Sequence, residues 1–145
     1  MRELNDFFKS IIDQDPMPVV ISDLEHIIVY MNPAAVENYR KRGGAALVGR
    51  SLMDCHNSRS CAVIEKVVKW FAESKEHNCL HTFFDDKKNK DVYMVALRDA
   101  KQELIGYYEK HELRTKDETP FYDFGDKKPN YSSEPEIPDC GCIYG

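Results

Sequence analysis

Three strand-like segments joined by short polar turns most strongly limit the folds open to this chain. Residues 79–84, 91–98 and 104–111 are rich in β-branched and aromatic side chains. The connections at 85–90 and 99–102 are polar and short. Short turns at this spacing are typical of an antiparallel meander, so the second half of the chain predicts three consecutive antiparallel strands.

The first half predicts a hairpin followed by a helix. Residues 19–22 and 26–31 are rich in β-branched side chains, and three residues separate them. Asn32 then precedes Pro33. An asparagine caps free backbone N–H groups, and the fixed φ of proline suits the first helical position. We expect this helix to end near Gly43, because glycine favours helix termination.

A second helix is predicted after the centre of the chain. Ser58 or Ser60 can cap it, and its apolar face recurs at helical spacing. That face consists of Ile64, Val67, Val68 and Phe71.

The N-terminal residues 3–13 also predict an amphipathic helix. Its apolar positions are Leu4, Phe7, Phe8, Ile11 and Ile12. Two interpretations stay open: the helix packs on its own domain, or it mediates dimerisation and signal transmission.

Composition indicates one globular domain with flanking segments. The 145 residues are 42% hydrophobic and 31% charged, with no run of about 20 apolar residues to span a bilayer. We predict an N-terminal amphipathic helix at 1–14, a domain at 15–114 and an irregular acidic tail at 115–145. Four of the seven prolines lie in that tail from Pro120 onward, where periodic apolar patterning is sparse.

Cysteine usage and charge suggest a compartment and exclude some partners. Five cysteines without framework spacing fit a reducing environment, and the N-terminus does not resemble a signal peptide, so we expect a cytoplasmic protein. The net charge is −5, and no concentrated basic patch is present. We therefore expect no direct nucleic-acid binding and no membrane association.

The order of these elements resembles a PAS domain, and several segments carry the resemblance. They are residues 21–23 (ISD), 28–35 (IVYMNPAA), 48–52 (VGRSL), 93–99 (YMVALRD) and 104–108 (LIGYY). The resemblance covers about residues 10–114. It implies an α+β fold, in which a five-stranded antiparallel sheet carries flanking helices on one face. PAS domains are sensory and dimerisation modules that often bind haem, flavin or small metabolites inside the sheet.

The central residues 54–60 (DCHNSRS) are similar to a bacterial PAS subgroup with a Cys-His-Pro-Pro-like segment at this helix entrance. Here Asn57 and Ser58 replace the two prolines. The resemblance makes His56 a candidate axial ligand of haem iron, against local capping or exposure as the alternative. Flavin photochemistry is not expected, since the reactive cysteine of that PAS type lies three residues after a glycine, where this chain has Leu52.

We place the candidate ligand site between the inner face of the sheet and the helical segments 33–42 and 53–71. The residues predicted to line it are Tyr30, Met53, Cys55, His56, Ile64, Val68, Met94 and Ala96. Cys55 is read as a buried inert thiol, with a redox role as the alternative.

Two further groups carry metal-ligating side chains. His77, Cys79 and His81 alternate along a predicted strand and would share one face, which suits either a transition metal or a polar outer surface. We favour the polar surface. Cys140 and Cys142 form a C-x-C in the tail that can bind a soft metal or form a disulfide, although an incidental sequence fits as well. At a strand end, Arg98 and Asp99 predict an ion pair.

Three functions fit these observations. The first is a small stand-alone sensory module that binds a small ligand in its core and signals through a homodimer or a protein partner in trans. The second is a haem-dependent gas or redox sensor with His56 as axial ligand. The third is a ligand-free structural dimerisation module. An enzyme is not expected, because the sequence shows no catalytic constellation.

Overall fold

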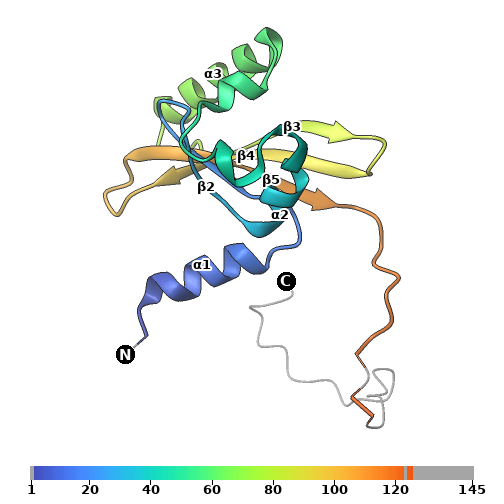
Figure 1. The fold of residues 1–145 in the computed structure, drawn as a ribbon. Helices are drawn as coiled ribbons and strands as arrows, with labels where there is room; N and C mark the ends of the chain where they lie inside the picture. The colour runs from blue at the N-terminus through green and yellow to red at the C-terminus, as the bar shows by residue number, and fades with distance from the viewer. Residues whose placement is uncertain (1, 123, 126–145) are drawn as a thin grey trace.

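The computed structural model describes residues 2–122 and 124–125, and its centre is a five-stranded antiparallel sheet in the order β2-β1-β5-β4-β3 (Figure 1). The strands are β1 (Val20–Asp23), β2 (Ile28–Met31), β3 (Cys79–Asp85), β4 (Lys90–Arg98) and β5 (Leu104–Leu113). The helices are α1 (Leu4–Gln14), α2 (Pro33–Asn38) and α3 (Ser58–Glu73), with short 3₁₀ turns at Arg40–Arg42, Gly44–Leu47 and Leu52–Cys55. The predicted α+β architecture is therefore confirmed.

The predicted hairpin and meander are both present. β1 pairs with β2, and β3, β4 and β5 pair in sequence order. The Asp23 carboxylate shapes the hairpin turn by accepting the Glu25 and Ile27 backbone N–H groups at 2.9 and 3.0 Å. The strands β1 and β5 approach closely at Gly106. A Cβ atom at this position would lie 2.3 Å from the Ser22 carbonyl oxygen, so a larger residue would clash.

The chain leaves α2 earlier than predicted. Asn32 caps the helix by accepting the Ala35 N–H at 2.9 Å, but α-helical geometry ends at Asn38 instead of near Gly43. Two 3₁₀ turns then carry the chain to Leu47. Gly43 lies between them with φ of 127°. This backbone conformation is unfavourable for other residues and ends the run of right-handed turns.

The cap of α3 also differs from the prediction. Asn57, and neither serine, caps the helix, because its side-chain oxygen accepts the Ser60 N–H at 2.9 Å. Asn57 has the extended backbone that an N-cap residue adopts, whereas Ser58 and Ser60 already lie within the helix. The serine caps are therefore wrong.

Arg98 closes the other end of α3. Its Nη2 group lies 2.8 Å from the Phe71 carbonyl oxygen and 3.0 Å from that of Ser74, both near the helix C-terminus. Asp99 instead accepts backbone N–H groups of its own turn. The predicted Arg98–Asp99 ion pair is wrong, since the last carbonyls of a helix need donors and a guanidinium supplies several.

Two apolar clusters form the core. Between α3 and the sheet lie Ile64, Val67, Phe71, Met94 and Tyr107. Around α2 lie Ile28, Met31, Ala35 and Leu47. Leu52 packs against both clusters, so the segment before α3 joins them.

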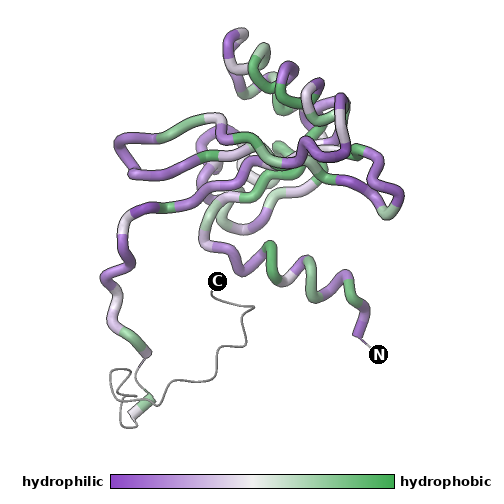
Figure 2. Tube along the Cα trace, turned by 180° about the vertical axis from the view of Figure 1, so that it is seen from behind, coloured by the Kyte–Doolittle hydropathy of each residue, from purple (hydrophilic) through white to green (hydrophobic). Residues whose placement is uncertain are grey.

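Helix α1 stands apart from this core. It lies on the opposite side of the sheet from α3 in Figure 1, and none of its residues is buried. Figure 2 shows apolar positions recurring along it. Within the described residues, no helix has the length and apolar character needed to cross a bilayer.

Candidate functional site

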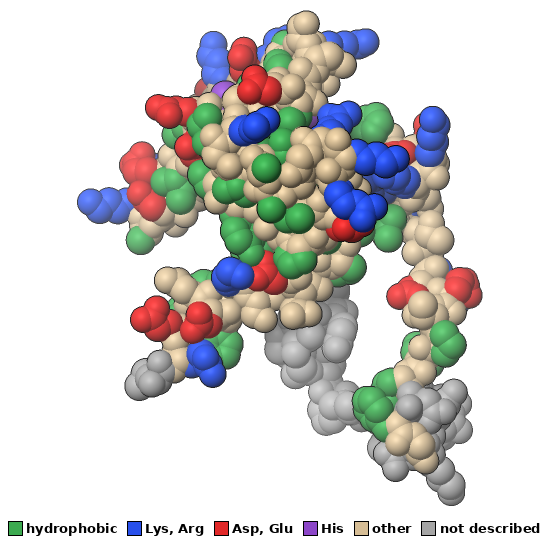
Figure 3. All heavy atoms as spheres, in the orientation of Figure 1, with side chains coloured by type: hydrophobic (Ala, Val, Ile, Leu, Met, Phe, Trp, Pro, Cys, Tyr) green, Lys and Arg blue, Asp and Glu red, His purple; other side chains and the backbone are tan. Residues whose placement is uncertain are grey.

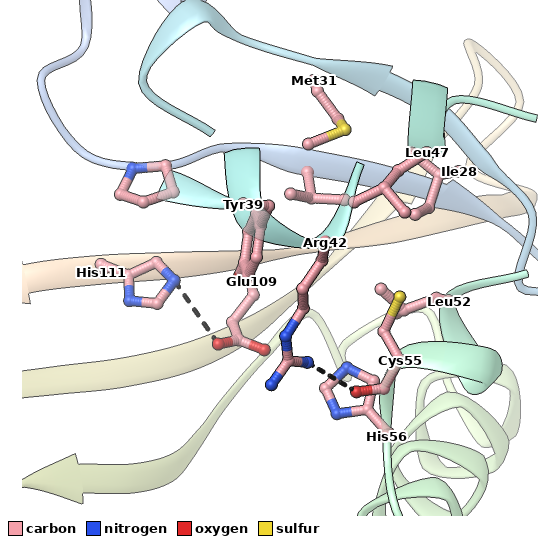
Figure 4. A pocket seen from close by; sticks show the side chains of 12 residues that line it. Ile28, Met31, Tyr39, Arg42, Leu47, Leu52, Cys55, His56, Glu109 and His111 are labelled. Atoms are coloured by element: carbon pink, nitrogen blue, oxygen red, sulfur yellow. Dashed lines mark hydrogen bonds and ion pairs between the residues drawn. The ribbon is translucent and has the colours of Figure 1, made fainter. Parts of the chain in front are cut away.

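A cavity of about 80 Å³ lies beside the apolar cluster around α2 (Figure 4). It is lined by Pro18, Val20, Ile28, Met31, Tyr39, Arg42, Leu47, Leu52, Cys55, His56, Glu109 and His111. β1, β2 and Leu47 supply an apolar wall. The segments after α2 and before α3, together with β5, supply the polar groups.

The polar end combines a guanidinium, an imidazole and a carboxylate. Arg42 Nη1 donates to the Cys55 carbonyl oxygen at 3.1 Å, which fixes the arginine beside the entrance to α3. Burial and the neighbouring positive charge of Arg42 lower the pKa of His56, so its imidazole is neutral at neutral pH. Burial raises the pKa of Glu109, and Lys90 only partly opposes this effect.

His111 is a largely buried polar side chain of the cavity wall. Only 9% of its side chain is exposed, and its Nδ1 atom has no hydrogen-bond partner. Its Nε2 atom lies 3.4 Å from a Glu109 carboxylate oxygen. Burial, followed by the positive charges of Lys90 and Lys88, lowers the pKa of His111 to about 4. His111 therefore places a neutral ring at the cavity wall, and one nitrogen of this ring is buried without a partner.

The eight residues predicted to line a ligand site fall in three places. Cys55 and His56 line the cavity. Tyr30 faces α1 instead, where its hydroxyl donates to the Asp13 carboxylate. The others pack within or against the α3 cluster, namely Met53, Ile64, Val68, Met94 and Ala96. The structure thus brings Cys55 and His56 together with polar residues that were not predicted.

Four polar lining residues were missed, namely Tyr39, Arg42, Glu109 and His111. Glu109 and His111 alternate with outward-facing residues along β5, in register with Met94 and Val92 of β4. Extending the period-2 pattern of this strand from its buried Tyr107 would have placed both on the inner face. Arg42 follows a short helix in a turn, where no periodicity marks its direction.

The candidate metal groups do not form a site within the described part of the chain. His77 stacks on Trp70 with ring centroids 3.9 Å apart, Cys79 is exposed, and His81 Nε2 lies 2.8 Å from an Asp91 carboxylate oxygen. No group of three or more His, Cys, Asp or Glu side chains is arranged there to hold a metal ion. Cys140 and Cys142 lie outside the described residues.

The cavity does not fit haem. His56 offers the neutral imidazole that iron ligation needs. However, sites for drug-sized ligands usually span about 300–1,000 Å³, and this cavity encloses about 80 Å³. A porphyrin would have to displace the side chains that line it, so the geometry favours a ligand of a few heavy atoms.

Comparisons with known proteins agree on the fold. No family model and no curated protein matches the sequence. A PAS domain from Colwellia psychrerythraea is 12% identical, with a TM-score of 0.57 over 76% of this chain and 96% of that one. The PAS domain of Bordetella pertussis BvgS is 16% identical, with a TM-score of 0.52 over 79% of this chain and 89% of that one.

A third structure is the Aer2 receptor from Vibrio cholerae, a dual PAS-haem oxygen sensor. It is 22% identical, with a TM-score of 0.50 over 68% of this chain and 94% of that one. At identities this low, the similarity indicates a shared fold and does not indicate a shared ligand. Together with the strand order and the helices described above, these similarities show that the chain folds as a PAS domain.

Proposed function

We propose that this protein is a sensory module whose domain at 15–114 binds a small molecule in the cavity and passes its occupancy to a protein contact. It acts by binding and not by catalysis. The observation that carries this proposal is the cavity itself, which joins an apolar wall to a charged end inside a PAS fold. Such a combination is typical of ligand sites, where a few polar groups fix the orientation of a ligand.

A short covalent and hydrogen-bonded route links the cavity to α1. Met31 lines the cavity, and the next residue, Asn32, is fully buried. The Asn32 side-chain nitrogen donates to the carbonyl oxygens of Ile12 and Met17, each at 3.0 Å. A ligand that shifts the end of β2 would therefore shift the C-terminal turn of α1 as well.

We further propose that α1 contacts a second copy of this chain. Leu4, Phe7, Phe8 and Ile11 are each more than half exposed, and Figure 3 shows α1 projecting from the body of the protein. Beside its C-terminal half, Ile11 and Ile12 border an open groove whose far side carries Leu97 and Tyr108 of the sheet. Two copies related by a twofold axis can bury the same apolar patch on each other, which makes the surface self-complementary.

Non-denaturing mass spectrometry of the purified protein tests the ligand. A bound small molecule is expected, and the Val20→Phe variant should lack it because the larger side chain fills the cavity. Val29→Phe is the matched control, since Val29 lies on the neighbouring strand and is half exposed. Urea unfolding of each variant shows whether it still folds. If Val20→Phe is more stable than the wild type and neither protein carries a small molecule, the cavity is a packing defect and the proposal is wrong.

Sedimentation velocity tests whether two copies of the chain form a dimer through α1. The wild type is expected to sediment as a dimer, and Phe7→Glu combined with Phe8→Glu should yield monomers with an unchanged circular dichroism spectrum. Val63→Glu, an exposed position on α3, is the matched control. A wild type that is monomeric at high micromolar concentration would contradict the dimer and leave the ligand proposal standing.

A further inference from the structure

Two opposite charges line the cavity without neutralising each other. The Arg42 guanidinium and the Glu109 carboxylate both face the enclosed space, as Figure 4 shows. Among the described residues, Arg42 forms no ion pair, and the nearest basic group to Glu109 is His111, which is neutral at neutral pH. Arg42 is exposed and the Glu109 side chain is 45% exposed, so solvent still reaches both charges at the cavity. Here each charge is left free to meet a complementary group on a ligand.

A third polar group is also unused. His111 Nδ1 is buried without a partner, a state that costs about 1–3 kcal/mol when no hydrogen bond forms. If the neutral ring donates from Nε2 toward Glu109, Nδ1 is an acceptor. An N–H donor on a ligand next to Glu109 would find the carboxylate as its acceptor, because His111 presents Nε2 to Glu109 and its buried Nδ1 lies on the other edge of the ring.

The approach to the cavity is basic. A surface depression shares Tyr39, Arg42, Cys55 and His56 with the cavity and adds Lys41 and Lys88. Figure 3 shows Lys and Arg side chains gathered on the side of the body that carries α2. Cations at a cleft entrance raise the local concentration of anionic groups. A ligand that enters by this route is therefore expected to carry a carboxylate or another small anion.

We infer that the cavity binds a small zwitterion of the α-amino-acid class. Its carboxylate pairs with Arg42, its ammonium group donates to Glu109, and a short aliphatic side chain lies on the wall formed by Ile28, Met31 and Leu47. A planar guanidinium suits a carboxylate in two-point contact. The enclosed volume of about 80 Å³ limits the ligand to a few heavy atoms beyond these charged groups. This inference rests on the proposed function, since it names the ligand class of the same cavity.

Isothermal titration calorimetry with four matched compounds tests the inference on the full chain. L-valine carries both charges, 2-hydroxyisovalerate and isovalerate lack the ammonium group, and isobutylamine lacks the carboxylate. Glycine and L-alanine are included to vary the side chain. At least one of the three amino acids is expected to bind about tenfold or more tightly than isovalerate and isobutylamine, because each charge-assisted hydrogen bond contributes about 1.5–3 kcal/mol.

Two variants assign the charged groups. Arg42→Gln and Glu109→Gln should each weaken amino-acid binding about tenfold or more. Arg40→Gln and Glu103→Gln, at exposed positions outside the cavity, should leave it unchanged. Isovalerate that binds as tightly as L-valine, unaltered binding by Glu109→Gln, or no binding of any amino acid would overturn the inference. The proposed function would then still be decided by the mass-spectrometric comparison of the wild type with Val20→Phe.

Discussion

The Asn32 side-chain nitrogen donates to the Ile12 carbonyl oxygen over 3.0 Å and thereby ties the end of α1 to the start of α2. The same nitrogen lies 3.3 Å from the Asp15 carbonyl oxygen and 3.0 Å from that of Met17. The side-chain oxygen accepts the Val19 and Ala35 N–H groups, each at 2.9 Å. A single buried amide therefore fixes three segments relative to one another.

We predict that Asn32→Asp destabilises the protein by about 3 kcal/mol or more, because it replaces a donor with a buried oxygen that faces three carbonyl groups. The substitution keeps the oxygen that caps α2, so it separates the donor role from the capping role. Urea unfolding followed by circular dichroism measures the change. Asn5→Asp at an exposed position of α1 is the control and is expected to change stability by no more than a few tenths of a kcal/mol. Equal unfolding midpoints for the two variants would contradict this role of Asn32.

We predict that Arg98→Lys loosens the C-terminal end of α3 and costs about 1–3 kcal/mol. Besides its contacts with α3, the guanidinium donates from Nε to the Asn78 side-chain oxygen at 2.7 Å and from Nη1 to the Gln102 carbonyl oxygen at 3.1 Å. A lysine has one nitrogen and cannot reach these acceptors together.

The single tryptophan reports on this region. Trp70 stacks on His77, and the His77 carbonyl oxygen lies 3.2 Å from Arg98 Nη2. We expect the Trp70 fluorescence of Arg98→Lys to shift to longer wavelength before global unfolding in urea. Arg59→Lys, at the exposed start of α3, is the control and should retain the wild-type emission. If Arg98→Lys keeps the fluorescence spectrum and the unfolding free energy of the wild type, the C-terminal end of α3 does not depend on the Arg98 guanidinium.

Haem binding gives a spectroscopic prediction. Because the cavity is far smaller than a porphyrin site, protein produced with added haem precursor is expected to show no Soret band. The His56→Ala variant should give the same spectrum. A strong Soret band that shifts or disappears in His56→Ala would instead mean that the cavity opens around haem, with His56 as the ligand.

The fold could be predicted from the sequence because its signals are local. The short polar turns of the meander and the hairpin between β1 and β2 correspond to runs of β-branched residues broken by polar ones. The same locality explains the errors. Asn57 caps α3 through one side-chain hydrogen bond, and neighbouring serines carry an equal propensity for that position. The local sequence pattern therefore predicts helix α3 but does not identify the residue that caps it.

The candidate site could be predicted only in part, because it depends on contacts across the chain. The sequence predicts that Cys55 and His56, adjacent at a helix entrance, line the ligand site, and both line the cavity. Tyr30 is predicted to line the ligand site, but its hydroxyl reaches Asp13 of α1, an arrangement that only the packing of α1 reveals. Arg42 and Glu109 are far apart in sequence, and only the fold brings both to the lining of one cavity.

The pH dependence of stability should reveal the His111–Glu109 pair at the cavity wall, in which the His111 side chain is 9% exposed and the Glu109 side chain 45%. Burial lowers the pKa of His111 from 6.5 to about 4, so between these values the unfolded chain binds a proton more readily and stability falls as the pH falls. Burial raises the pKa of Glu109 above 4.5, so in the window just above that value the folded chain binds the proton more readily and stability rises as the pH falls. The two effects oppose each other in the wild type.

We therefore predict that Glu109→Gln loses stability more steeply than the wild type as the pH falls from 6.5 toward 4, and that His111→Gln loses it less steeply. Lys88 and Lys90 are charged groups that act on this pair, and His56, whose pKa is also lowered, adds to the His111 effect in every protein. Urea unfolding at half-unit pH steps measures the slopes, which differ by up to about 1.4 kcal/mol per pH unit for one proton. His81→Gln on the exposed face of the sheet is the control. If both variants share the wild-type slope, Glu109 and His111 bind protons equally well in the folded and the unfolded protein, and neither pKa is shifted by folding.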